Sequence, residues 1–450
     1  MRKATRTISG VTPIPVMAKP LRCPGECIYC PAEPSVPKSY TMESPAALAA
    51  RKQDYDPGKQ VEARMGILHR MGHPTDKIEL IVLGGTILAY PPHYQYQFIK
   101  SCFDALNETE SSTLEEAQKL NQRAKHRSVG LCIETRPDWC GPAEVKRMLA
   151  FGVTRVELGV QTLDDEIYHL VRRGHRVKEV IEATKLLKDN GFKVYYHWMP
   201  GLPGSTAEWD LQLFKKLFHD QEFRPDGLKI YPTLVVKGTE LEGWYQAGRY
   251  KPYPGEEMID LIARSKAQTP KYARISRVMR EIPAKFIVAG LKTSSLREEV
   301  KQRMEELGLE CQCIRCREYG HRSKQGWKIG EPKLKRFDYQ ASEGREIFLS
   351  FEDEEETLYA ILRMRVPSNN GDLALIRELH VFGPEVPLGT KSSEAAQHKG
   401  LGRALLEEAE KIAHNELRSG KIAVLSGIGA REYYSEIGYQ FETPYMVKRL

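Results

Sequence analysis

Six short apolar runs, separated from one another by amphipathic or polar segments, constrain the fold of this chain more than any other feature. They predict strands at Ile78–Leu83, Val129–Ile133, Arg155–Val160, Val194–Met199, Gly227–Val235 and Arg274–Val278. Helical patterns between them include Pro142–Phe151, Lys178–Asn190 and Thr206–His219. Strands that alternate with helices predict a parallel α/β sheet curled into a partial (β/α)6-type barrel. The functional groups of such a barrel gather at the carboxyl ends of its strands.

The pattern changes after residue 300. Residues 311–340 are rich in cysteine, then in basic residues and glycine, which is typical of a linker module. Beyond them we expect strands at Glu346–Phe351, Thr357–Arg365, Leu373–Val381 and Lys421–Ser426, and a helix at Gly402–Glu416. We therefore predict three parts: a barrel domain with a basic N-terminal segment at 1–300, a Cys-rich linker at 301–340, and a mixed α+β domain at 341–450.

Composition excludes several classes of protein. No apolar run in the 450 residues is long enough to cross a bilayer, and the first residues lack the apolar stretch of a signal peptide. We therefore expect a cytoplasmic protein with no membrane partner. The net charge of +7 permits nucleic-acid binding without requiring it. Basic residues crowd the stretch from Lys271 to Lys292, where a phosphate-binding face and an ordinary solvated face are both possible.

Three cysteines near the N-terminus have the spacing of an iron–sulfur loop. Cys23, Cys27 and Cys30 follow the pattern C-x3-C-x2-C, and one short loop with that spacing can present three thiolates to a [4Fe–4S] cluster. The fourth iron is then left open for another ligand. The alternative is a zinc knuckle that takes its fourth ligand from elsewhere. The neighbouring Tyr29 and the Gly84-Gly85-Thr86 string at the next strand end favour the cluster.

A second cysteine triplet predicts a structural zinc site. Cys311, Cys313 and Cys316 are too crowded for a disulfide framework, and thiolates this close can fill three corners of a tetrahedron. Free thiols in a surface loop are the alternative. The sequence leaves the fourth ligand open, and the candidates are His321, which is nearest in sequence, and Cys102, Cys132 and Cys140.

A glycine-containing loop near the C-terminus predicts an acyl-CoA site. The string Gln397-His398-Lys399-Gly400-Leu401-Gly402-Arg403 follows a predicted strand and opens a predicted helix. Small residues let backbone N–H groups surround a pyrophosphate, and the start of the helix adds its positive end. Lys399 and Arg403 add charges that pair with phosphates. The string matches the Q/R-x-x-G-x-G/A pattern of GCN5-type acetyltransferases.

Taken together, these motifs resemble one known family. The chain is similar to the radical S-adenosylmethionine superfamily and, within it, to the Elp3 family, which comprises the catalytic subunit of Elongator and stand-alone relatives in bacteria and archaea. The likeness runs nearly end to end, over Arg6–Pro13, Cys27–Pro31, Leu83–Thr86, Glu134–Asp138, Pro225–Leu234, Arg377–Val381 and Pro444–Lys448.

The resemblance implies roles for individual residues near the cluster. The first cysteine triplet would ligate the cluster, and S-adenosylmethionine would bind its open iron. Gly84, Gly85 and Thr86 would line the methionine end of that cofactor, because missing Cβ atoms let the backbone approach closely. The other cofactor-binding positions are Glu134, Gln161 and Lys77, of which Lys77 would contact acetyl-CoA from the radical domain. An exposed lysine at a helix–strand junction is the alternative for Lys77.

The resemblance also implies roles in the acyl site. The strand segment Glu378, Leu379, His380 and Val381 would polarise the thioester carbonyl through its backbone N–H groups. Tyr433 or Tyr434 would protonate the departing CoA thiolate, a role that suits a phenol close to sulfur. Core aromatic packing is the alternative for one member of the pair.

The implied activity is modification of tRNA. An enzyme of this family would use acetyl-CoA and a 5′-deoxyadenosyl radical to place a carboxymethyl group on carbon 5 of the wobble uridine. It would bind the anticodon stem-loop and require an electron donor for its cluster. We expect no Elongator-type partner subunits, because the chain starts close to its first cysteine triplet. The alternatives are a protein lysine acetyltransferase whose iron–sulfur domain is structural, and a tRNA-binding scaffold with vestigial sites.

Overall fold

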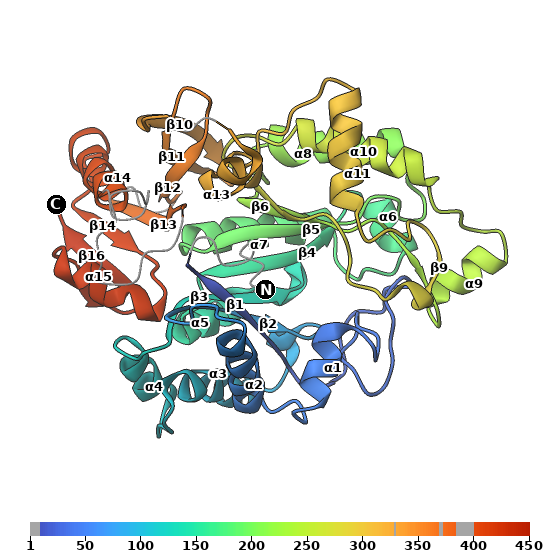
Figure 1. The fold of residues 1–450 in the computed structure, drawn as a ribbon, viewed down its shortest axis with the longest axis horizontal. Helices are drawn as coiled ribbons and strands as arrows, with labels where there is room; N and C mark the ends of the chain where they lie inside the picture. The colour runs from blue at the N-terminus through green and yellow to red at the C-terminus, as the bar shows by residue number, and fades with distance from the viewer. Residues whose placement is uncertain (1–9, 328–329, 369–371, 384–399) are drawn as a thin grey trace.

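The fold consists of two seven-stranded sheets that meet along a buried junction (Figure 1). The description rests on a computed structural model and covers residues 10–327, 330–368, 372–383 and 400–450. Within these residues a third, two-stranded sheet pairs β7 (Val235–Val236) with β9 (Ile287–Ala289). None of the helices described there is long and apolar enough to cross a membrane.

The first sheet is the predicted partial barrel. Its strands run in the order β1-β2-β3-β4-β5-β6-β8, and each neighbouring pair is parallel. The strands are β1 (Thr12–Met17), β2 (Lys77–Leu83), β3 (Arg127–Thr135), β4 (Arg155–Gln161), β5 (Lys193–Trp198), β6 (Gly227–Ile230) and β8 (Arg274–Arg277). The fold class predicted from the alternation of strands and helices is therefore confirmed.

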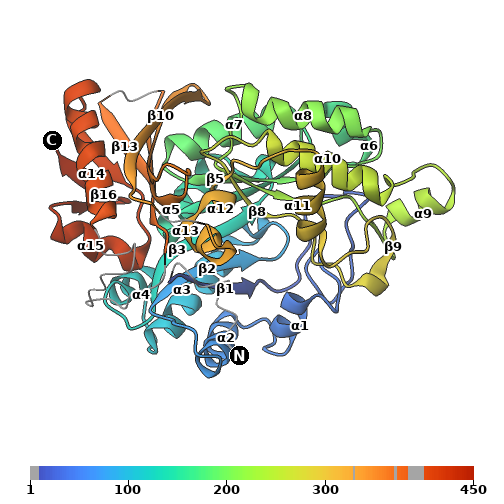
Figure 2. The same ribbon diagram turned by 45° about the horizontal axis from the view of Figure 1, so that its top comes forward.

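Helices cover the outer side of this sheet, as Figures 1 and 2 show. Alternate residues of each strand face them: in β2, Ile78, Leu80 and Val82 are buried in the main core, whereas Lys77 and Glu79 lie on the other face. The helices of this half are α1 (Pro45–Arg51), α2 (Pro57–Arg70), α3 (Pro92–Asn107), α4 (Leu114–Asn121), α5 (Pro142–Phe151), α6 (Asp165–Leu170), α7 (Val177–Asp189), α8 (Ala207–His219), α9 (Glu240–Gln246), α10 (Gly255–Ala267) and α11 (Leu296–Glu306).

Two strand predictions need correction. The barrel has seven strands rather than six, because β1 was missed: Pro13 and Pro15 interrupt its apolar pattern. Proline cannot donate a ladder hydrogen bond, but residues two apart point to the same side, and β1 is an edge strand that can turn both prolines away from β2. The strand predicted at Gly227–Val235 is also too long, since β6 ends at Ile230 and the chain then enters the small sheet.

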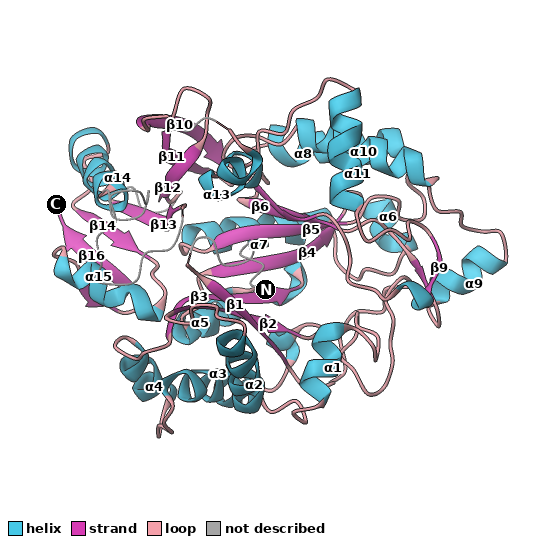
Figure 3. Cartoon of the chain, viewed as in Figure 1, coloured by secondary structure: helices cyan, strands magenta, loops and turns pink. Residues whose placement is uncertain are grey.

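The second sheet forms the C-terminal part, and its strands run in the order β10-β11-β12-β13-β14-β16-β15. They are β10 (Lys333–Ala341), β11 (Gly344–Glu352), β12 (Leu358–Val366), β13 (Leu373–Val381), β14 (Lys421–Val424), β16 (Tyr445–Arg449) and β15 (Gln440–Glu442). All pairs are antiparallel except β13–β14. Helix α14 (Leu401–Lys411) packs on this sheet, and α15 (Arg431–Glu436) follows β14 (Figure 3).

The predicted linker contains regular structure. β10 begins at Lys333, inside that stretch, and pairs with β11 along its whole length. The short helices α12 (Ile314–Arg317) and α13 (Tyr319–Arg322) precede it. Ile314 packs in one buried cluster with Tyr272 from the barrel half and Phe348 and Leu358 from the second sheet, so this stretch lies at the junction of the two halves.

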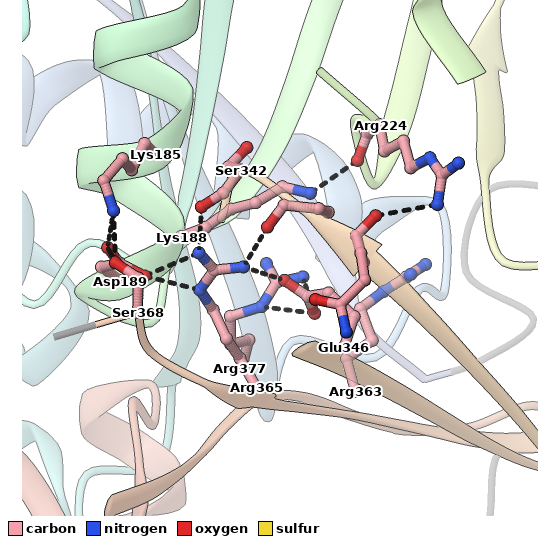
Figure 4. A network of polar contacts seen from close by, with 12 residues as sticks. Lys185, Lys188, Asp189, Arg224, Ser342, Glu346, Arg363, Arg365, Ser368 and Arg377 are labelled. Carbon is pink, nitrogen blue, oxygen red and sulfur yellow. Dashed lines mark hydrogen bonds and ion pairs between the residues drawn. The ribbon is translucent and has the colours of Figure 1, made fainter. Parts of the chain in front are cut away.

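A buried network of charges fills the junction (Figure 4). Arg377 on β13 donates two 2.7 Å hydrogen bonds to Asp226, which directly precedes β6. Arg377 also meets Glu346 of β11, and Arg365 of β12 joins Glu346 to Asp189 of α7. Each of the two guanidinium groups therefore contacts one carboxylate of the second sheet and one of the barrel half.

Candidate functional site

The first cysteine triplet lies in the loop that leaves β1 and is fixed by two other loops at the mouth of the barrel. The Ile28 amide donates to the carbonyl of Val171 (3.2 Å), just beyond α6, and the Ile28 carbonyl accepts from Leu241 of α9 (2.9 Å). Cys27 is buried, whereas Cys23 and Cys30 are half-buried. These contacts place the loop at the carboxyl end of the strands.

The surroundings of the triplet set different pKa values for its thiols. Burial, reinforced by the neighbouring Cys27, raises the pKa of Cys30 to about 11. Burial acts in the same direction on Cys27, but the Arg173 guanidinium and its hydrogen bond to the sulfur outweigh it and lower the pKa of that thiol. Cys27 is therefore the member of the triplet with the strongest electrostatic support for a thiolate.

The donor set fits a group larger than a single ion. Around one zinc ion, Zn–S bonds of about 2.3 Å would hold the sulfurs about 3.8 Å apart. Among the described residues, Cys23, Cys27 and Cys30 are not one of the triplets whose ligand atoms all lie within 4.8 Å of one another. Three thiolates that share one loop at a wider spacing suit the corners of a [4Fe–4S] cluster.

The predicted cofactor-binding string follows β2 beside the cysteines. Gly84 and Gly85 have φ values of +120° and +63°, which residues with a side chain rarely adopt. Thr86 follows, and its Oγ1 lies 3.9 Å from Cys23 Sγ. The structure thus brings the end of this string close to the cysteine loop, and its role in binding a cofactor stays a prediction.

Gln161 ends β4 at the same mouth of the barrel. It is buried and has a φ of +75°, a strained value for a residue with a side chain. Its carbonyl accepts from Met199 (2.8 Å), while its side-chain Oε1 has no hydrogen-bond partner among the described residues. A buried amide oxygen without a partner is costly, so Gln161 is suited to bind a ligand that donates to it.

Glu134 belongs to a charged cluster on the inner face of the barrel. Lys229 Nζ lies 2.9 Å from Glu134 Oε1 and also contacts Glu157, and His197 Nε2 lies 2.9 Å from Glu157 Oε2. Burial raises the pKa of Glu157, but Lys229, His197 and Arg155 outweigh it and hold that pKa well below its usual range. The ligand atoms of the two glutamates and His197 are close enough to hold a metal ion, but the Lys229 ammonium already supplies the positive charge there.

Sequence reasoning singled out only Glu134 of this cluster. The other members could have been recognised as charged or polar residues inside the predicted strands. Glu157, His197 and Lys229 occupy inward positions of β4, β5 and β6. Tyr231, which directly follows β6, packs edge-on against His197 with ring centres 5.2 Å apart.

Lys77 lies at the opposite, amino end of the barrel. It is the first residue of β2 and pairs in register with Arg127 of β3. Arg127 in turn faces the second half, since its Nη1 lies 3.9 Å from Glu432 of α15. Lys77 is therefore distant in the fold from the cysteine mouth, and it lies near the docked C-terminal domain.

The acyl-CoA loop is described only from Gly400 onward, and Gln397 and Lys399 lie outside the described residues. Gly400 has a φ of +78° and caps α14, whose first residues are Leu401, Gly402 and Arg403. A Cβ at Gly402 would lie 3.4 Å from Val381 Cγ2 and 3.7 Å from Tyr433 Oη. The start of α14, the end of β13 and Tyr433 therefore converge.

The end of β13 separates from its neighbour on one side. The parallel ladder with β14 ends at Ile376–Val424, whereas β13 continues to Val381. Glu378, Leu379, His380 and Val381 therefore run beyond the end of β14, as a thioester-binding strand requires. The side chain of Glu378 is held by Arg363 (2.7 Å) and by Lys193 of β5 (3.3 Å), so it belongs to the junction.

The two tyrosines divide between site and core. Tyr434 is buried and packs edge-on against Tyr439 in the core of the second sheet. Tyr433 is 40% exposed and lies near Gly402. Burial raises the pKa of Tyr433, so its phenol keeps the proton that a general acid must donate.

The second cysteine triplet is assembled as a compact ligand set. Sulfur atoms of Cys311, Cys313 and Cys316 all lie within 4.8 Å of one another, as a single tetrahedral ion requires. Cys313 is buried, and the amide that follows it donates to Ala273 of the barrel half (2.9 Å). Hydrogen bonds from Cys311 and Cys316 lower the pKa of Cys313.

The structure does not bring the proposed fourth ligand to this triplet. His321 Nε2 instead faces Glu318 Oε1 at 3.0 Å, and the described ligand group does not include it. Cys102, Cys132 and Cys140 are buried in α3, in β3 and after it, and do not join the group either. The suggestion of His321, which came from sequence proximity alone, is thus not supported by the arrangement.

The basic stretch near residues 271–292 is largely neutralised. Lys271 pairs with Glu356, Arg274 with Glu318 and Lys285 with Glu43. Arg277, the last residue of β8, pairs with Glu281 in the loop that follows. These partners favour the interpretation as a solvated, ion-paired face.

The parallel half-barrel and the cysteine loop at its mouth define a radical S-adenosylmethionine protein. A family model described as the Radical SAM superfamily matches residues 20–217, and one described as the Radical_SAM C-terminal domain matches residues 225–306.

Full-length relatives narrow this class. The chain is 57% identical over 459 residues to a tRNA uridine(34) acetyltransferase of Dehalococcoides mccartyi (strain CBDB1), with all of both chains covered. It is 41% identical over 471 residues to Elongator complex protein 3 of Homo sapiens, covering all of this chain and 86% of that protein. The solved structure of the archaeal Methanocaldococcus infernus Elp3 with an N-terminal deletion has a TM-score of 0.89 and 48% identity, covering 99% of this chain and 100% of that one. The chain belongs to the Elp3 family.

Proposed function

We propose that this chain is a tRNA-modifying enzyme that acts on the wobble uridine, uridine 34. The observation that carries the proposal is identity of 57% to a tRNA uridine(34) acetyltransferase along the whole of both chains. Two archaeal relatives with the same name are 50% identical over the full length of this chain. A lysine acetyltransferase with a merely structural cluster is not favoured, because it would have no use for the strained strand ends at Gly84, Gly85 and Gln161.

The radical half would hold two cofactors at the mouth of the barrel. Cys23, Cys27 and Cys30 would ligate a [4Fe–4S] cluster, and Gly84 to Thr86 together with Gln161 would bind S-adenosylmethionine. When bound, this pair supplies a carbon radical strong enough to take hydrogen from a methyl group. The residues of the chain position the reacting atoms and exclude water. An external electron donor is required, and we propose that no Elongator-type subunits are.

The acyl half would bind acetyl-CoA between α14 and the free end of β13. Backbone N–H groups of residues 400–403 at the start of α14 would bind the pyrophosphate, and those N–H groups of residues 378–381 that do not pair with β12 would bind the thioester carbonyl. Tyr433 would protonate the thiolate as the thioester is cleaved. The acetyl methyl group would lose one hydrogen atom to the deoxyadenosyl radical, and its carbon would bond to carbon 5 of the uridine. Carbon 5 would then lose its hydrogen as a proton, with one electron returning to the oxidised cluster, and water would cleave the thioester to leave a carboxymethyl group and CoA thiol.

The second triplet would hold zinc as a clamp between the halves. Cys311, Cys313 and Cys316 supply three ligands, and the fourth is a group outside those the sequence suggested. Ile314, between two of these cysteines, packs in the core that both halves share. A metal here would therefore stabilise the junction and take no part in chemistry.

Nucleoside mass spectrometry tests the proposed function. tRNA is incubated anaerobically with reconstituted protein, S-adenosylmethionine, acetyl-CoA and dithionite. We expect a uridine that gains a carboxymethyl group with the wild type and with Cys102→Ala, whose cysteine is buried in α3, and not with Cys27→Ala. Acetylated lysine peptide in the absence of reductant, with unmodified tRNA, would establish the alternative function.

A further inference from the structure

Arg173 is a buried arginine beside the first cysteine triplet, and all three nitrogens of its guanidinium donate hydrogen bonds. Nη1 donates to Cys27 Sγ at 3.4 Å, and Nε donates to His175 Nε2 at 3.1 Å. Nη2 donates to the carbonyl of Gly159 on β4. Only 7% of the residue is exposed. Its orientation is thus fixed by three contacts on three different segments.

The partners of Arg173 differ from those of the most deeply buried arginines. Among the described residues no carboxylate forms an ion pair with Arg173, whereas every one of the most deeply buried arginines has an acidic partner: Arg317 with Glu352, Arg363 with Glu378, Arg365 with Asp189 and Glu346, and Arg377 with Asp226 and Glu346. A buried charge without a counter-charge is costly. The contact with Cys27 Sγ therefore marks the place of the missing negative charge.

His175 does not supply that charge. Burial, together with the positive Arg173 and Arg136, lowers the pKa of His175 to about 2, so its ring is neutral and only accepts a hydrogen bond. Gly159 likewise offers a neutral carbonyl. Among the contacts of the guanidinium, only the sulfur can become an anion.

We propose that Arg173 donates an N–H···S hydrogen bond to the cluster ligand Cys27 and raises the reduction potential of the cluster. The inference rests on the proposed function, since it requires the cluster to occupy the first triplet. A cluster held by three thiolates is anionic and gains one more negative charge when it is reduced. A fixed cation and a hydrogen bond to a ligating sulfur therefore stabilise the reduced form more than the oxidised form.

The test is a redox titration of the reconstituted protein without S-adenosylmethionine. Electron paramagnetic resonance measures the fraction of reduced cluster at each potential. For Arg173→Gln we expect the equilibrium constant for reduction to fall at least tenfold, which is about 59 mV for one electron. Arg173→Lys keeps the charge and should show a smaller change. The matched control is Arg172→Gln, because Arg172 is the adjacent residue, carries the same charge, is 55% exposed and pairs with Glu240.

A fully assembled cluster with an unchanged potential in Arg173→Gln would overturn the proposal. If that variant does not assemble a cluster, the proposal is tested on the wild-type protein instead. Reduced wild-type protein labelled with nitrogen-15 arginine should show a nitrogen hyperfine coupling to the cluster in pulsed resonance spectra. The coupling should persist in Arg136→Lys, because Arg136 is the other arginine whose charge acts on Cys27. A wild-type spectrum without nitrogen coupling, or a coupling that disappears in Arg136→Lys, overturns the proposal. Failure of the wild type to assemble any [4Fe–4S] cluster would instead refute the proposed function.

Discussion

Replacement of Arg377 by methionine should destabilise the barrel half, although Arg377 belongs to the second sheet. Its guanidinium donates to Asp226 twice at 2.7 Å, to Glu346 at 2.7 Å and to the carbonyl of Phe192 at 2.8 Å. All these groups are buried, and Asp226 begins the turn into β6. Arg377→Met would leave two buried carboxylates without their main partner.

The expected loss is about 3 kcal/mol in the free energy of unfolding. Breaking a buried ion pair from one side typically costs about 3–5 kcal/mol. The lower end applies because Asp226 keeps the Val194 amide at 2.8 Å and Arg363 at 3.6 Å, and Glu346 keeps Arg365 at 2.9 Å. A matched control is Arg336→Met, whose bidentate partners Asp338 and Glu416 are on the surface, and which should cost less than about 1 kcal/mol.

The pH dependence gives an independent check. Burial raises the pKa of Asp226, but Arg377 outweighs it and holds that pKa below its usual range. In the wild type the stabilisation is present above the unfolded pKa of about 3.9 and is lost as the pH falls through the folded pKa. In Arg377→Met, burial dominates and the pKa of Asp226 rises. The destabilisation should therefore be largest at pH 8 and shrink as the pH falls.

Urea unfolding followed by tryptophan fluorescence measures this effect. All five tryptophans precede β10, so the signal reports on the barrel half and its linker. A midpoint shift worth less than about 1 kcal/mol at pH 8, or a destabilisation that grows as the pH falls, would refute the reasoning. In that case water or a rearranged Arg363 would be neutralising Asp226.

Four further results follow from the structure. Cys313→Ser should lose the bound zinc, measured by elemental analysis, and lower the midpoint of the same urea transition; full zinc content would contradict the ligand assignment. Lys229→Met should abolish carboxymethylation and destabilise the protein by about 3 kcal/mol, because it leaves Glu157 buried beside a second carboxylate; a stable, active variant would exclude a role for the inner cluster. Tyr433→Phe should lower CoA release at least tenfold at unchanged KM for acetyl-CoA, and an unchanged rate would remove it as the acid. Because the pKa of His175 is lowered to about 2, protonation of the unfolded state below its pKa of about 6.5 should cost the wild type about 1.4 kcal/mol between pH 7.5 and 5.5, a loss that His175→Gln should not show.

The sequence predicted the elements that follow from local pattern and missed those that depend on partners. The barrel strands with uninterrupted apolar runs were found, whereas β1, with its two prolines, was identified only by its place at the sheet edge. β10 escaped because most of its residues are exposed, and only pairing with β11 defines it.

The same division holds for the site. Spacing found both cysteine triplets, because their ligands are close in sequence. Arg173 and Lys229 could not be found in this way, because the partners of each are far away in the sequence. Arg173 meets Cys27, which is 146 positions away, and Lys229 meets Glu134, which is 95 positions away.

The arrangement also constrains how the two halves cooperate. The cysteine loop lies at the carboxyl ends of the strands, whereas the C-terminal domain contacts residues at their amino ends: Arg127 of β3, Lys193 of β5 and Asp226 before β6. Strands of six or seven residues separate these ends by about 20 Å. Under the proposed function, an acetyl group bound by the second half would therefore have to cross the length of the barrel to reach the cluster.

The inner face of the barrel carries a set of linked ion pairs between β2, β3, β4 and β6. Lys77 and Glu79 lie on the inner face of β2, Arg155 joins Glu79 to Glu157, and Lys229 joins Glu157 to Glu134 near the mouth. Lys77 lies at the amino end of the barrel, beside the docked domain. At this place its ammonium would meet the phosphates of a CoA that enters from that side. The lysine that looked like an ordinary strand-start residue in the sequence thus begins the strand, β2, whose Glu79 starts this chain of ion pairs.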